Sequence, residues 1–299
     1  QSTEDFHLLL LHHARRHIKE AFEKDSVILP QGKAISKYSS EELMKWSSSA
    51  KRYELSLKNQ EQVYEVLACI DRAVELDTGK YSMRDIQKIS ILLLAEGIKA
   101  NKGRLLQIRT GEGKSTITAG FAAFMRFFTK KLIDVVTSSS ILAIRDSDEK
   151  KGFFQMLSMK VEHNISKQNK GLKGCYECDV VYGDALSFQS DLLRTEFEMK
   201  GIKGKRVCED SVVIVDEVDS MLIDEAAKIA KLASPAAGME HLLVMFVSIW
   251  TYLENSGVNR EILENQEQYH EIEKHVHEVI DRIISDNLDS PFTQFPVET

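Results

Sequence analysis

The stretch "RTGEGKST", residues 109–116, stands between an apolar run at 104–109 and a segment with helical periodicity that begins near Lys114. It matches the phosphate-loop pattern G-x-x-x-x-G-K-[ST] except at the first glycine, where Ile108 stands. A glycine turn lets backbone amides approach an anion, and the N-terminus of a helix attracts negative charge. The stretch alone fits a nucleotide site or an ordinary glycine turn.

A second motif, "SVVIVDEVD" at 211–219, distinguishes these interpretations. Val212 to Val215 predict a buried strand, and Asp216 and Glu217 follow at its carboxyl end. In an open parallel sheet, phosphate loops and ligand crevices lie at the carboxyl ends of the strands. We therefore expect the two motifs to form one nucleotide site, in preference to a pair of solvated carboxylates that merely end a strand.

Each residue of this expected site has a chemical role. Lys114 is expected to reach the β- and γ-phosphates of ATP, while Ser115 and Asp216 hold Mg²⁺, Asp216 through water. Glu217 is expected to orient and deprotonate the attacking water. The candidate catalytic residues are thus Glu217, Lys114 and Asp216. The loop residues expected around the nucleotide are Arg109, Thr110, Gly111, Glu112 and Gly113.

Alternating patterns around the two motifs predict an α/β fold. Val/Ile-rich runs at 132–137, 179–184 and 211–215 are separated by amphipathic segments. Such uninterrupted apolar strands, joined through helices, are typical of a parallel sheet covered on both faces. We expect the apolar run "RLLQIR" at 104–109 to be a further strand, directly before the glycine turn.

Helical patterns flank this region. Ser39 and Glu42 have the spacing of a capping box, apolar residues at 63–74 share one helical face, and 83–100 continues as a helix with an apolar side. The uncharged apolar run at 242–253 is shorter than the roughly twenty residues of a membrane-spanning helix, and we interpret it as a buried helix.

The composition restricts the classes of partner. The chain of 299 residues has a net charge of -7, so a broad basic face for nucleic acid is not expected. Its 4 cysteines are too few for a disulfide framework in a chain of this length. Cys175 and Cys178 form a lone C-x-x-C, and His13 and His17 are four residues apart. In both places we favour coincidence or a solvated basic face over a metal site.

Together these motifs resemble the N-terminal ATPase lobe of SecA, the preprotein translocase motor. The resemblance covers about residues 57–226 and rests on "MRDIQ", "RTGEGKS", "VVTSSSILAIRDSD", "DVVYGD", "DLLR" and "IVDEVDSMLIDEA". Members of the wider DEAD-box-like superfamily lack the first phosphate-loop glycine, so Ile108 agrees with the family pattern. The resemblance implies that Gln87 reads the adenine edge with Arg84 as its supporting neighbour, and that Asp219 links the nucleotide site to neighbouring motifs.

The chain also departs from the family pattern. Ser138, Ser139 and Ser140 follow "VVT" where SecA has an Asn-Asp pair, and Asp184 follows Tyr-Gly where SecA has threonine. After "LIDEA" the chain turns helical, whereas SecA continues into a mostly β preprotein-binding domain. The 299 residues contain no Q-x-x-G-R-x-G-R-like motif, through which a second lobe supplies arginine fingers.

We therefore expect a piece of a larger motor, or a divergent module that uses half of one. Three regions are predicted: a helical N-terminal section at 1–80, a RecA-like ATP-binding lobe at 81–235 and a helical C-terminal appendage at 236–299. The expected function is ATP–Mg²⁺ binding in a SecA-like motor that moves polypeptide, with little turnover by the chain alone.

The resemblance also implies partners. A second RecA-like lobe, in the same full-length chain or in a partner, would complete the ATP site. A preprotein and a membrane channel follow from the family, as does a cytoplasmic location, peripheral at a membrane. Two alternatives stay open: a nucleic-acid helicase lobe of the same superfamily, and a nucleotide-gated interaction module without turnover.

Overall fold

A computed structural model describes residues 14–100, 102–166, 168, 171–204, 206, 211–221, 239–255 and 266–286. By its internal contacts the chain divides into two units, 1–231 and 232–299, and each is described by itself. The predicted region boundaries after residues 80 and 235 stay predictions.

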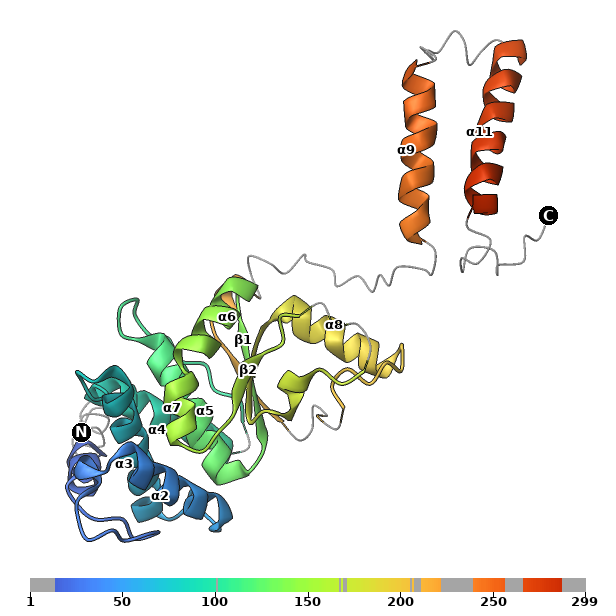
Figure 1. The fold of residues 1–299 in the computed structure, drawn as a ribbon. Coiled ribbons are helices and arrows are strands. Elements are labelled where there is room, and N and C mark those ends of the chain that lie inside the picture. Colours follow the sequence, from blue (N-terminus) through green and yellow to red (C-terminus); the bar gives the residue numbers. More distant parts are fainter. Residues whose placement is uncertain are drawn as a thin grey trace. The chain divides into compact units, whose positions relative to one another are not determined.

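A parallel sheet with the strand order β2-β3-β1-β4 organises the first unit (Figure 1). In the inner strand β1, Ile133 lies opposite Val180 of β3 on one side and Val212 of β4 on the other. All pairs are parallel, so the carboxyl ends of the strands share one edge, and the predicted α/β fold is confirmed. The strands are β1 (Leu132–Thr137), β2 (Val161–His163), β3 (Val180–Asp184) and β4 (Ser211–Val215).

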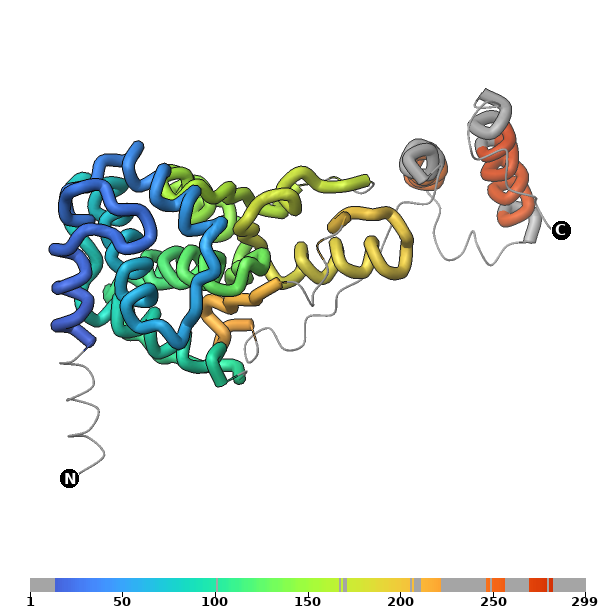
Figure 2. Tube along the Cα trace, turned by 90° about the horizontal axis from the view of Figure 1, so that it is seen from below, coloured from blue at the N-terminus to red at the C-terminus, as the bar shows by residue number. Residues whose placement is uncertain are grey.

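Helices cover both faces of this sheet. Figures 1 and 2 show α8 on the side of the sheet away from α2–α5. The predicted capping box is present, because Ser39 accepts from the Glu42 amide while the Glu42 carboxylate accepts from the Ser39 amide. The helices are α2 (Ser40–Arg52), α3 (Gln60–Thr78), α4 (Asp85–Lys99), α5 (Lys114–Thr129), α6 (Ser140–Glu149), α7 (Lys151–Met156) and α8 (Ala185–Glu196), with short 3-10 helices η1 (Ile35–Lys37) and η2 (Gly174–Glu177).

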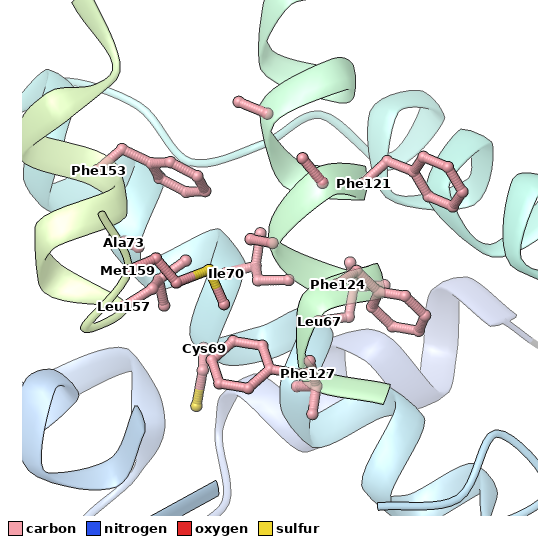
Figure 3. Packing of buried hydrophobic residues seen from close by; sticks show 14 of the residues in the cluster. Leu67, Cys69, Ile70, Ala73, Phe121, Phe124, Phe127, Phe153, Leu157 and Met159 are labelled. Carbon is pink, nitrogen blue, oxygen red and sulfur yellow. The ribbon is translucent and has the colours of Figure 1, made fainter. Parts of the chain in front are cut away.

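One apolar core joins the N-terminal helices to the sheet. Figure 3 shows the α5 side chains Phe124 and Phe127 near Leu67 of α3, with Phe153 of α7 in the same cluster. The Phe127 ring also meets Trp46 of α2 edge to face, with 5.4 Å between centroids. Burying each such ring contributes about 1.5–3 kcal/mol. Helix α5, which follows the glycine turn, is therefore anchored in this core.

Two strand predictions need correction. The run at 104–109 forms no strand: it pairs with none of the described strands, and Leu105 is 81% exposed, so only Ile108 packs on the core. Strand β4 lies where it was predicted but is buried on one face only. Val212 and Ile214 pack against the core, whereas Val213, on the other face, is 55% exposed.

The second unit contains α9 (Met239–Asn255) and α11 (Gln266–Asp286), which contact each other. Tyr252 stacks on His275 with 3.8 Å between ring centroids. The predicted helix at 242–253 is confirmed, but its interpretation as buried is wrong, because Trp250 is 65% exposed. Among the described residues, no helix combines the length and apolarity needed to cross a membrane.

Candidate functional site

The glycine turn before α5 is built on left-handed backbone. Gly111 has φ 85° and Gly113 has φ 76°, a region that side-chain-bearing residues rarely adopt. The amide of Glu112 donates to the carbonyl of Arg109 at 3.2 Å and closes the turn. Helix α5 then begins at Lys114, and no side chain caps it. Its first amides and the positive end of its dipole therefore face the turn without a side-chain partner at the cap, an arrangement suited to an anion.

The N-terminal end of helix α4 supports this turn. The buried Gln87 amide donates from Nε2 to the carbonyl of Glu112 at 2.9 Å, and its Oε1 accepts from the Arg84 amide at 2.9 Å. The Arg84 guanidinium donates to the carbonyl of Gly111 at 3.3 Å and pairs with the Glu112 carboxylate at 2.8 Å. Gln87 and Arg84 thus hold the loop by its backbone, and adenine recognition by Gln87 stays a prediction.

A cleft of about 370 Å³ opens where the turn meets the carboxyl ends of β1 and β4. The structure brings seven of the predicted site residues to its wall, from both motifs. Arg84, Gln87, Arg109 and Glu112 do not line it. The lining residues are Thr110, Gly111, Gly113, Lys114, Ser115, Thr137, Ser138, Leu142, Arg145, Asp146, Asp216 and Glu217.

Two adjacent carboxylates, Asp216 and Glu217, line this cleft together with Lys114. The Asp216 amide donates to the carbonyl of Val136 at 2.8 Å, which continues the β1–β4 ladder by one residue. Burial raises the pKa of the Asp216 carboxyl, and the neighbouring charge of Glu217 raises this pKa further. Lys114 partly offsets the rise. The half-buried Asp216 carboxylate is a fitting ligand for a divalent cation, with the Ser115 hydroxyl as a neutral oxygen on the same wall and the exposed Glu217 carboxylate next to it.

The sequence around this site also matches a protein-family model. The model for the SecA DEAD-like domain matches residues 7–280 of the chain. The chain belongs to the SecA DEAD-like domain family. The predicted resemblance to SecA is thereby confirmed, and over a longer stretch than the quoted motifs cover.

Curated relatives of this SecA-family chain are named as SecA subunits of the protein translocase. "Protein translocase subunit SecA" of Campylobacter jejuni subsp. doylei is 35% identical over 157 residues, which are 52% of the chain and 18% of the relative. The protein of that name from Treponema denticola is 35% identical over 143 residues, 48% of the chain and 15% of the relative. "Protein translocase subunit SecA 1" of Clostridioides difficile is 36% identical over 148 residues, 49% and 16%. The matches thus span less than a fifth of each of these relatives.

Sequence reasoning missed one wall of the cleft in this SecA-family lobe. Thr137 ends β1, Ser138 follows it, and Leu142, Arg145 and Asp146 belong to α6. The Arg145 guanidinium donates to the buried Asp146 carboxylate at 2.6 Å. These residues lie at the site because β1 is the neighbour of β4, and only the strand order shows this. The usable signal was the apolar run "LIDVVT" ending in polar residues.

The remaining candidates lie away from the cleft. Cys175 is buried, and burial raises the pKa of its thiol to about 12. The ring of His17 stacks on Tyr64 at 5.6 Å, and His13 lies outside the described residues. Among the residues that the structure describes, no group of three or more His, Cys, Asp or Glu side chains is arranged to hold a metal ion.

Proposed function

We propose that the chain is an ATP–Mg²⁺-binding lobe of a SecA-type motor. The observation that carries the proposal is the meeting of Lys114, at the start of α5, with Asp216 and Glu217, at the end of β4, in one cleft. A lysine at a helix N-terminus beside two carboxylates suits a phosphate chain accompanied by Mg²⁺. The open surroundings of Gly111, where an added Cβ would meet nothing within 4 Å, fit the same interpretation.

The residues of the cleft divide the work. Lys114 and the α5 amides bind phosphate oxygens, while Ser115 and Asp216 hold the cation. The cation, when bound, neutralises charge on the phosphates. Glu217 orients the attacking water and accepts its proton, as a carboxylate beside the phosphate chain can do. Before ATP binds, Gln87 and Arg84 hold the loop. When ATP binds, Gln87 exchanges its backbone partners for the adenine edge.

The wider function follows from the family and from the relatives' printed name, protein translocase subunit. The lobe works with a second RecA-like lobe, which supplies positive charge that these residues lack. The motor so completed moves preprotein through a membrane channel from the cytoplasmic side, lying peripherally on the membrane.

Replacing Lys114 tests the nucleotide site. Lys114→Ala is expected to lower the affinity for Mg-ATP at least about tenfold, because a phosphate contact from a charged donor is lost. Isothermal calorimetry gives the affinity, and urea unfolding shows that the fold is kept. The matched control is Lys80→Ala, an exposed lysine outside the cleft wall. Equal affinities for the two variants would contradict the proposal.

A further inference from the structure

We infer that Ser138 restrains the Glu217 carboxylate and thereby slows hydrolysis, so that Ser138 is a positioning residue for the site. The inference rests on the proposed function, in which Glu217 acts on water. It concerns a serine in the segment after "VVT", where the chain departs from the SecA pattern.

The two residues meet across neighbouring strands. Val136 of β1 lies opposite Val215 of β4, and Ser138 and Glu217 each lie two residues beyond this pair. The Ser138 hydroxyl donates to Glu217 Oε2 at 2.5 Å. The direction is fixed, because an ionised carboxylate can only accept. Both side chains line the cleft, so the bond forms at the place where the water must be handled.

The backbone at Glu217 shows that its pose is constrained. Its φ is 57°, in the left-handed region that residues with a side chain seldom adopt. Such a conformation persists where the surroundings over-determine it, and it is common at functional sites. The continued ladder bond from the Asp216 amide holds one side of this residue, and Ser138 holds its carboxylate.

This restraint opposes the role of a general base. Oε2 accepts the serine hydroxyl, so the lone pair used there is withdrawn from water. The donated hydrogen bond also stabilises the negative charge that the carboxylate must give up when it takes a proton. Removing the hydroxyl should therefore raise the rate at which Glu217 acts, and it should leave phosphate binding by Lys114 and the α5 amides unchanged.

Ser139 provides the matched control. It is the next residue along the chain, but its hydroxyl accepts from the Leu142 amide at 3.3 Å and caps α6. It does not line the cleft. A general disturbance of this loop would affect Ser138→Ala and Ser139→Ala alike, whereas loss of the restraint would affect Ser138→Ala alone.

The experiment measures single-turnover hydrolysis of radiolabelled Mg-ATP with the whole chain in excess, over hours. Ser138→Ala is expected to hydrolyse about tenfold faster than the wild type, since an exposed hydrogen bond to a charged group lies at the weak end of its usual range. Ser138→Thr keeps the hydroxyl and the slow rate, and Ser139→Ala keeps the slow rate with lower stability. Ser138→Ala with Glu217→Gln returns to the rate of Glu217→Gln alone.

Calorimetry on the same variants separates the two ideas. If the wild type and Ser138→Ala bind Mg-ATP equally well and the rate rises as stated, the inference holds. Equal rates, both at background included, a fall in rate, or a rise that survives Glu217→Gln would overturn it while leaving the proposed function intact. A wild type that binds no Mg-ATP would overturn both.

Discussion

Gly113 is the residue at which the glycine turn touches helix α4. A Cβ built on Gly113 would lie 2.4 Å from Gln87 Nε2, whereas one on Gly111 would meet nothing within 4 Å. Both glycines have left-handed backbone, so alanine strains both by about 1–3 kcal/mol. Gly113→Ala should lose more, because it must also displace the Gln87–Glu112 hydrogen bond. Urea unfolding of the two variants measures the difference, and equal losses would contradict the brace described for this loop.

Gln87 has two roles that one comparison separates. Gln87→Ala should weaken ATP binding about tenfold and flatten the preference for ATP over GTP, because the adenine edge loses a bidentate partner. Loss of the bond to Glu112 alone would weaken both nucleotides equally. Calorimetry with ATP and GTP distinguishes these outcomes. An equal loss for the two nucleotides would assign Gln87 to the loop and exclude it from adenine recognition.

Some of the residues that line the cleft could be predicted one by one from the sequence. Lys114, Ser115, Asp216 and Glu217 could be predicted because each belongs to a short motif whose chemistry needs that residue type. Arg145 was not assigned to the site, although it stands in the quoted stretch "VVTSSSILAIRDSD", because the chemistry of that stretch alone gives an arginine on a helix no role at a phosphate. It lines the cleft only through the adjacency of β1 and β4, which is a property of the sheet.

Helix α2 begins at a capping box that depends on the ionised Glu42. A side-chain hydrogen bond from Lys33, together with the Ser39 amide, lowers the pKa of Glu42 from 4.5 to about 2. Because the folded-state pKa is lowered, this stabilisation is full above pH 4.5 and is lost as the pH falls toward 2. Glu42→Gln should therefore flatten the dependence of the unfolding free energy on pH in this window. Urea unfolding across the window tests this, with Glu41→Gln in the same helical turn as control.

Elements with their own start signals were predictable, and elements that depend on a neighbour were not. Helix α5 and strand β1 follow directly from periodicity and from the glycine turn. The run at 104–109 has the residues of a strand, but a strand exists only where another strand lies beside it. Likewise, apolar periodicity showed that 242–253 is helical, but could not show that α11 leaves Trp250 exposed.

For the whole chain, the site supports binding better than turnover. Among the residues that the structure describes, the cleft wall carries two cations, Lys114 and Arg145, and Arg145 is paired with Asp146. An arginine supplied by a partner lobe raises the rate of such phosphoryl-transfer reactions about 10³–10⁵-fold. We therefore expect the chain to bind ATP and to hydrolyse it barely above background, with Glu217→Gln changing the affinity little. A steady-state phosphate-release assay decides this. Turnover of about one per second, abolished by Glu217→Gln, would show that these residues complete the site themselves.

The position of β4 at the margin of the described sheet has a practical consequence for anyone handling the protein. On one side, the ladder groups of this strand have no pairing strand among the described residues, and Val213 and Val215 add exposed apolar surface. A margin of this kind is a template on which another extended chain can grow. When the protein is concentrated, it would then precipitate from its folded state, without unfolding first. The substitution Val213→Lys would counter such precipitation, because a charged side chain on this strand opposes the addition of another strand.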